Sequence, residues 1–297
     1  MKKSFLVALV SLLLVASCNK DEEIIIDNTE DDPPQSGIIL DYEVLEYTPA
    51  PGQYINDVAN GSAGISSPSQ ACEYANNRLA NSQYVSLGSW GGYIVVKFKE
   101  AILNSGGYDF SIGSNAFDTS NEPGIVWVMK DDNVNGLPDD EWYELKGSFF
   151  NQEGYQRNFW VTYFKPEAKQ ATVWTDKDGE TGEIEWLGNY HSQDFYYPQW
   201  VKEDSYTLYG SILPPQASQN ELGIWKNDPF DWGYADNFGE DFITDGAKNQ
   251  FKISNAVDKN NAPINLSSID FIKVQTGVLS TSGWLGEIST EITGFYR

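Results

Sequence analysis

Apolar and polar residues alternate along much of the chain after residue 84, and groups of Gly, Asn and Asp interrupt the alternation. A period of two is typical of β-strands with one buried face, and the interrupting residues are those that turns favour. A short strand is also expected just after residue 41. The pattern predicts further strands at 93–98, 108–112, 125–130, 142–146, 159–164, 171–174, 205–209, 251–253, 269–274 and 288–295.

One segment has a helical pattern instead. Ser67 and Pro68 form a start signal, because proline fits the first turn of a helix. Cys72, Ala75 and Leu79 follow at spacings of three and four, which places them on one face. We expect a helix that ends near Leu79, with Cys72 as a small core residue.

Many strands with one helix predict an all-β fold, a β-sandwich or jelly roll with one short helix and long aromatic loops. The two long connections are predicted at 176–204 and 211–249. Long loops on a rigid sandwich commonly carry binding sites. No repeat of about 40 residues is visible, which argues against a propeller.

The first residues indicate export. Two lysines precede an apolar run at 5–15, which is shorter than the ~18 to 20 residues of a membrane-spanning helix. The run closes with Ala16-Ser17-Cys18, which resembles a bacterial lipobox, and an acidic segment follows. A plain secretory signal with an incidental Cys18 is the alternative. We expect a signal peptide at 1–17, lipidation at Cys18, a flexible acidic tether at 18–37 and a single β-sandwich binding domain at 38–297.

The composition of the sequence limits the classes of molecule that we expect the protein to bind. The sequence has 19 basic and 43 acidic residues and a formal net charge of −24, so its surface should repel nucleic acid and anionic lipid. Cations and polar neutral ligands suit such a surface. Beyond Cys18 the only cysteine is Cys72, so no disulfide framework is expected.

Oxygen-bearing side chains occupy alternate positions between the predicted strands 125–130 and 142–146. Alternate residues of a short loop can point inward around Ca²⁺, and Gly136 permits the sharp bend. Trp142 replaces the bidentate glutamate of an EF-hand, so the pattern resembles the hairpin calcium loops of integrin-type propellers instead. An ordinary acidic turn is the alternative. We expect a structural Ca²⁺ held by Asp131, Asn133, Asn135, Leu137 (through its carbonyl) and Asp139.

The long connections are rich in aromatic residues, whose flat rings can stack on a sugar or a corrin edge at small entropic cost. Trp160 and Trp174 lie on alternating strands and are expected in the core. His191 is the only histidine, and it could coordinate a corrinoid cobalt or be a simple surface residue. The candidate ligand-binding residues are Trp186, Tyr190, His191, Tyr196, Tyr197, Trp200 and Trp232.

A second cation site is conceivable where acidic residues recur near the C-terminus, although no spacing supports it. The residues concerned are Asp236, Glu240, Asp241, Glu287 and Glu291. The sequence has no zinc-type cluster, no GxSxG motif and no glycine-rich phosphate loop, so we do not expect an enzyme. Glycoside hydrolysis needs only two carboxylates, and a sequence with 43 acidic residues does not forbid it.

Several segments together resemble a family of Bacteroidetes cell-surface lipoproteins, some of which accompany outer-membrane corrinoid uptake. The resemblance is carried by 47–56, 85–94, 109–117, 122–125, 131–141 and 232–237, and it covers about residues 42 to 297. The order of these segments also looks like that of galactose-binding-type jelly rolls, in which calcium braces the sandwich. The resemblance supplies no catalytic residues.

The resemblance implies a lipid-anchored protein on the exterior of the outer membrane. It would capture a nutrient, with a corrinoid such as vitamin B12 as the implied ligand, for a TonB-dependent transporter. A carbohydrate-binding module of a glycan-uptake system is the first alternative. A protein-binding or adhesion surface protein is the second, and an exposed apolar patch rather than a pocket would favour it.

Overall fold

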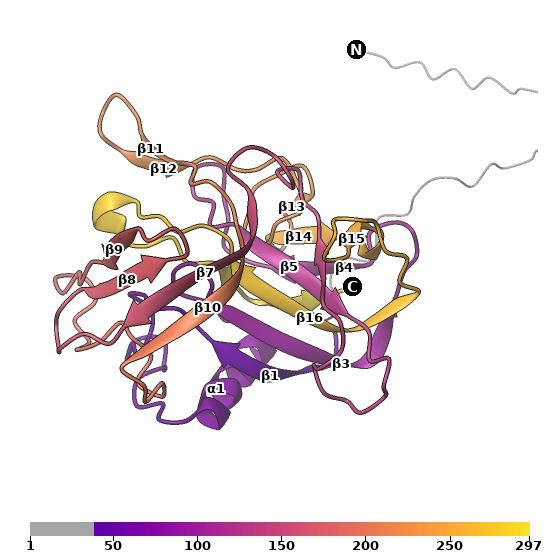
Figure 1. Ribbon diagram of the computed structural model, residues 1–297, viewed down its shortest axis with the longest axis horizontal. Helices are drawn as coiled ribbons and strands as arrows, with labels where there is room; N and C mark the ends of the chain where they lie inside the picture. Colours follow the sequence, from indigo (N-terminus) through magenta and orange to yellow (C-terminus); the bar gives the residue numbers. More distant parts are fainter. Residues whose placement is uncertain (1–38) are drawn as a thin grey trace, which may run out of the picture. The chain divides into compact units, whose positions relative to one another are not determined.

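A computed structural model describes residues 39–297, except the side chain of Trp284. The predicted signal peptide at 1–17, the lipidation site Cys18 and the tether at 18–37 lie outside the described residues. The described chain is mostly β, with one short helix and several antiparallel sheets, as a β-sandwich requires (Figure 1). The predicted fold class is therefore confirmed.

The largest sheet has six strands in the order β1-β3-β16-β5-β6-β15, and its neighbours are antiparallel. Its centre joins segments that are far apart in sequence, because β16 lies between β3 and β5. We call it the six-stranded sheet. Its strands are β1 (Tyr42–Thr48), β3 (Tyr93–Leu103), β16 (Ser268–Thr276), β5 (Gly124–Met129), β6 (Tyr143–Leu145) and β15 (Ala256–Val257).

One face of this sheet packs against a second sheet, the β4 sheet, in the order β13-β14-β4-β18. Phe110 and Phe251 stack with ring centroids 5.3 Å apart, and Phe295 packs with them in the same buried cluster. Each such fully buried ring contributes about 1.5–3 kcal/mol by leaving water. The strands are β13 (Phe242–Ile243), β14 (Lys248–Phe251), β4 (Phe110–Gly113) and β18 (Gly294–Tyr296).

A third sheet, the β7 sheet, has the order β10-β7-β8-β9 and its own core. Trp90 is fully buried there, edge-on to Phe159 at 5.2 Å, and its Nε1 donates to the Ser211 carbonyl at 3.1 Å. Tyr163 donates to the Trp90 carbonyl at 2.7 Å. The strands are β10 (Ser205–Ile212), β7 (Gln156–Phe164), β8 (Thr172–Asp176) and β9 (Thr181–Ile184).

The predicted helix is present as α1 (Pro68–Ala80). Ser67 caps it by accepting a hydrogen bond from the Gln70 amide at 3.3 Å. Ala75 and Leu79 are fully buried against the main core, and Cys72 packs beside them as predicted. Figure 1 shows α1 next to β1, at the edge of the six-stranded sheet.

The remaining elements are short, and several lie in regions predicted as loops. Both predicted long connections contain strands. The sequence pattern did not reveal them, because strands of two to four residues are too short to show a period of two. The predicted strand at 288–295 is divided in two, and Gly294 has a positive φ of 151° at the break. These elements are β2 (Val85–Ser86), β11 (Ala217–Gln219), β12 (Trp225–Asn227), β17 (Glu291–Ile292), η1 (Ile253–Asn255) and η2 (Gly283–Leu285).

None of the helices in residues 39–297 is long and apolar enough to span a bilayer.

Candidate binding groove and buried carboxylate cluster

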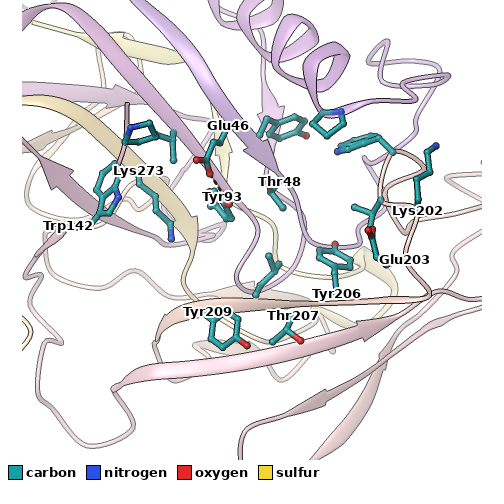
Figure 2. Close-up of a pocket in the computed structure, with 17 residues that line it drawn as sticks. Glu46, Thr48, Tyr93, Trp142, Lys202, Glu203, Tyr206, Thr207, Tyr209 and Lys273 are labelled. Atoms are coloured by element: carbon teal, nitrogen blue, oxygen red, sulfur yellow. Dashed lines mark hydrogen bonds between the residues drawn. The ribbon is translucent and has the colours of Figure 1, made fainter. Parts of the chain in front are cut away.

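One cavity lined by the described residues has a volume of about 640 Å³. It opens between β1 and β3 on one side and β10 on the other (Figure 2). We call it the groove. Its polar and aromatic lining includes Glu46, Thr48, Tyr93, Trp142, Lys202, Glu203, Tyr206, Thr207, Tyr209 and Lys273.

Aromatic rings line the groove from separate segments, among them β10 and the residues just before β6. Tyr209 is on β10 and is 64% exposed, whereas Tyr206, on the same strand, is half-buried and donates to the Pro49 carbonyl at 2.7 Å. Trp142 enters from the residues just before β6 and is half-buried. Rings that are partly covered and partly exposed can stack on a flat ligand with little loss of entropy.

Charged groups meet at the β3 side of the groove. Tyr93 donates a hydrogen bond to the Glu46 carboxylate at 2.9 Å (Figure 2). The Lys273 ammonium lies 4.5 Å from the centroid of the Tyr93 ring and 5.1 Å from that of Trp127. None of the ion pairs among residues 39–297 includes Lys273. Its charge is therefore balanced mainly by aromatic faces, which leaves its N–H groups available to a ligand oxygen.

Burial lowers the pKa of Lys273 from 10.5 to about 8, and the nearby Glu46 carboxylate opposes this change. The alternation of side chains along β16 explains why Lys273 faces the groove. Ile272 and Val274 face the main core, so Lys273 between them must point to the opposite face, where the groove lies.

A second feature lies outside the groove lining. One carboxylate oxygen each from Glu122, Asp236 and Glu291 lies within 4.8 Å of the other two. We call these three residues the carboxylate cluster. They come from the residue before Pro123 and β5, from the loop after β12, and from β17. This buried acidic cluster could hold a metal ion.

Each carboxylate of the cluster accepts one N–H hydrogen bond. The Ser289 amide donates to Glu122 at 3.2 Å, and the Glu291 amide donates to Asp236 at 2.9 Å. The side-chain amide of Asn115 donates to Glu291 at 3.0 Å. Asp236 Oδ1 and Glu291 Oε1 are buried and have no hydrogen-bond partner.

None of the ion pairs in the described part of the chain includes a member of the cluster. Burial, and then the neighbouring Glu291, raise the pKa of Glu122 and of Asp236 well above the usual range. Burial also raises the pKa of Glu291. Buried carboxylates without a counter-ion are costly, so the site favours protons or a cation.

The cluster reaches solvent through a pocket of about 310 Å³. Glu291 and Asn115 contribute to its wall, together with Tyr54, Asp57 and Arg78. Arg78 is engaged elsewhere, since it donates to the Asn60 carbonyl at 2.8 Å. The pocket therefore gives an ion or a water molecule access to at least one carboxylate of the cluster.

The predicted calcium loop forms the connection between β5 and β6. Its side chains bond to one another: Asp131 accepts the amides of Asn135 and Gly136 at 3.0 and 2.9 Å. Asn133 and Asn135 both donate their side-chain amides to Asp139. These contacts also describe a well-formed Asx turn, which is the alternative. Amide orientations are assigned from such networks, so rotation of both amides would present oxygens to an ion.

Two of the predicted ligand residues cannot contact a ligand in this conformation. Tyr196 and Tyr197 are each 1% exposed and lie in the core of the β7 sheet. Their hydroxyls donate to the carbonyls of His191 and Glu203, both at 3.0 Å. The prediction that these two rings contact a ligand was wrong, because both rings fill the core of the β7 sheet rather than extending into solvent.

The other predicted aromatic residues are scattered. Trp200 is 5% exposed but lies on the groove wall, and it alone of the predicted ligand set does so. Trp186 is half-buried and donates to the Gln193 carbonyl at 2.9 Å, whereas Tyr190 is 66% exposed. Trp232 lines a different cavity of about 260 Å³.

His191 lies outside the groove lining and is half-buried. Its ring meets the Tyr54 ring edge-on at 4.9 Å, and burial lowers its pKa. The nearby Asp57 carboxylate opposes that change. The histidine is thus nearer to the pocket above the carboxylate cluster than to the groove, because Tyr54 is part of that pocket.

The acidic residues predicted as a second cation site are only partly brought together. Asp236 and Glu291 belong to the cluster, and its third member is Glu122, which was not in the predicted set. Asp241 instead accepts the Gly233 amide at 2.6 Å, and burial raises its pKa to about 6. Glu287 accepts the Gln53 amide at 2.8 Å. Glu122 was missed because a single glutamate before a strand gives no local signal.

Comparison with known proteins gives no relative: no protein-family model matches the chain, and no curated protein matches it. The resemblance to Bacteroidetes cell-surface lipoproteins therefore stays a prediction.

Proposed function

We propose that this protein is a surface-anchored binding protein whose groove captures a polar, ring-shaped nutrient without transforming it. The observation that carries the proposal is the groove itself, in which exposed and half-buried rings alternate with charged and hydroxyl groups. A saccharide matches this surface best, because sugar rings stack on aromatic faces while their hydroxyls bond to polar side chains.

The individual residues support such a role. Tyr209 and Trp142 offer ring faces, and Thr207 lies between the two tyrosines of β10 on the groove wall. Lys273 can donate to a ligand hydroxyl or carboxylate. Glu46 already accepts a hydrogen bond from Tyr93, which fixes the orientation of both side chains. This partial ordering reduces the entropy that binding costs.

The resemblance implied a corrinoid, and corrinoid capture beside a TonB-dependent transporter remains within the proposal. The groove favours a saccharide over a corrinoid for one reason. His191, the only imidazole available to cobalt, is not part of the groove lining. Attachment to the outer membrane, facing the exterior, rests on the signal and on Cys18.

A structural Ca²⁺ is also part of the proposal. In the loop between β5 and β6, Asp131 and Asp139 would be its charged ligands, with Asn133, Asn135 and the Leu137 carbonyl completing the set. Such an ion would brace the loop next to the groove, because Pro138 and Trp142 both line it.

Calorimetric titration of the full chain in detergent and calcium buffer tests the binding role. The ligands are a panel of oligosaccharides and, separately, cyanocobalamin. We expect one oligosaccharide class to bind. Response to cyanocobalamin alone would replace the saccharide by the corrinoid, and silence toward both would refute nutrient capture and favour a protein partner.

Variants then place the ligand. Tyr209→Ala should weaken the affinity by about 10-fold, as expected for one lost ring contact. The matched control is Tyr190→Ala, which removes an exposed tyrosine outside the groove lining and should leave the affinity unchanged. The reverse result would move the ligand to the loop that contains His191.

A further inference from the structure

We propose that Glu122, Asp236 and Glu291 form a Ca²⁺ site that links three distant segments of the chain. The site is separate from both the groove and the predicted calcium loop. It does not depend on the proposed binding function.

The donor set selects the kind of ion. The three side chains offer only carboxylate oxygens, with no imidazole or thiolate among them. Hard cations such as Ca²⁺ prefer such ligands, whereas zinc sites usually include histidine or cysteine. Ca²⁺ also accepts bidentate carboxylates and irregular geometry, whereas Mg²⁺ requires a nearly ideal octahedron. The three carboxylates therefore supply at least three of the six to eight oxygens that Ca²⁺ takes.

Two buried oxygens without partners point independently to a ligand. Asp236 is 0% exposed and Glu291 is 5% exposed, yet Asp236 Oδ1 and Glu291 Oε1 accept no hydrogen bond. An unsatisfied buried acceptor costs about 1–3 kcal/mol, and more when it is charged. On each of these carboxylates the other oxygen is already engaged, by the Glu291 amide or by the Asn115 side chain. The unpartnered oxygens are therefore the ones available to an ion.

The backbone holds the three carboxylates in place before an ion arrives. The Glu122 amide donates to the Asp236 carbonyl at 3.0 Å, and Gly124 and Ala235 exchange a pair of backbone hydrogen bonds of 2.8 and 2.9 Å. Glu291 pairs with Ser86 in β17 and β2. Asp236 has a positive φ of 53°, a conformation that Asp and Asn adopt more readily than most residues. A preorganised site of this kind loses little entropy when it binds its ion.

The pocket beside the cluster supplies the remaining ligands. Glu291 and Asn115 are in its wall, so water can reach an ion that is bound to Glu291. Tyr54 lines the same pocket, and burial together with the charges of Glu291 and Glu122 raises the pKa of its hydroxyl. Because the ring lines the same pocket as Glu291, it can sensitise the luminescence of Tb³⁺, a common substitute for Ca²⁺.

The test counts ion sites in the full chain after treatment with chelator. Tb³⁺ luminescence and Ca²⁺ calorimetry are recorded for the parent, for Asp236→Asn and for Glu291→Gln. Asparagine keeps the shape and tolerates the positive φ of residue 236. The matched control is Asp131→Asn with Asp139→Asn, which removes the charges of the predicted calcium loop and leaves the cluster unchanged.

We expect each cluster variant to lose one of the Ca²⁺ sites counted in the parent, because the affinity of that site falls on the order of 100-fold or more. The loop control should retain the cluster site. The proposal is overturned if a cluster variant keeps every site of the parent with the same affinity, or if the parent binds no Ca²⁺ at all. Circular dichroism of each variant in chelator shows that it is folded; should one variant fail to fold, the other decides.

Discussion

Replacement of Lys273 by methionine tests whether the charge of Lys273 lowers the stability of the fold while it serves ligand binding in the groove. Lys273 is on β16 at the centre of the six-stranded sheet, and its ammonium lies over the rings of Tyr93 and Trp127 without an ion-pair partner among the described residues. Methionine has a similar length and no charge. It should therefore fill the same space while removing the desolvation cost.

The size of the effect follows from the pKa. Lowering the pKa of Lys273 from 10.5 to about 8 corresponds to a cost of about 3 kcal/mol for the charged form in the folded state. Cation–π attraction to the two aromatic rings offsets about 1 kcal/mol of this cost. Because the side chain also keeps some solvent contact, we expect Lys273→Met to raise the free energy of unfolding by about 1–2 kcal/mol. The melting temperature should rise by about 2–6 °C.

The pH dependence gives a sharper test than the size alone. Between about pH 8 and pH 10.5 the unfolded chain keeps a proton on Lys273 that the folded chain has lost. The free energy of unfolding of the parent therefore gains a contribution that increases with pH in this window and is constant below it. The variant lacks this contribution, so its advantage over the parent should be full at pH 7 and mostly gone at pH 10.

Urea denaturation of both proteins at pH 7 and pH 10 measures these differences. Lys99→Met is the matched control, because the Lys99 side chain is 75% exposed and its substitution should change stability by less than about 0.5 kcal/mol. The reasoning fails if Lys273→Met is the less stable protein at pH 7, or if its advantage is the same at both pH values. The same variant should bind the groove ligand more weakly, since a donor is lost.

Three further predictions concern stability. Asp131→Ala with Asp139→Ala should abolish the part of the calcium-dependent rise in melting temperature that belongs to the loop, and an unchanged response in calorimetry would mean that the loop is only a turn. Ser67→Ala should cost about 1 kcal/mol in urea denaturation, because the cap of α1 is lost; a change near zero would contradict this role. Gly88→Ala should destabilise by about 3 kcal/mol or prevent folding, since Gly88 has φ of 69° and a Cβ would overlap the Ala50 carbonyl oxygen; thermal melting checks it.

Local patterns in the sequence were sufficient for the elements but not for their arrangement. The alternation at 93–98 and 269–274 identified two strands, and their pairing as neighbours in the six-stranded sheet is a long-range contact that alternation does not encode. The helix was easier, because its start at Ser67 and its apolar spacing are both local signals. Strands of two or three residues such as β11 and β12 exist through tertiary pairing and have no detectable period.

The candidate sites show the same limit. Tyr209 and Lys273 each looked like an ordinary residue of an alternating strand, and they line one groove only because β10 and β16 are brought face to face. Tyr196 was a candidate ligand-binding residue because it lies in a long connection, yet it fills a core. Burial depends on what covers a segment, which composition does not specify.

The two candidate sites share one physical property: each holds charged side chains that no ion pair among the described residues compensates. Most buried polar groups in this protein have partners; for example, Asn249 bonds to Asn237 and Asp241 deep in the β4 sheet region. Lys273 and the carboxylate cluster carry charges of opposite sign and make no ion pair, although Glu46 lies near Lys273 and Arg78 shares a pocket with Glu291. They do not neutralise each other: Lys273 lines the groove, Glu291 lines a separate pocket, and no ion pair among the described residues joins them. A protein that leaves both charges uncompensated loses stability at two places, and such losses are expected where a ligand supplies the missing partner. We therefore expect the groove to bind an oxygen-rich ligand and the cluster to bind a divalent cation.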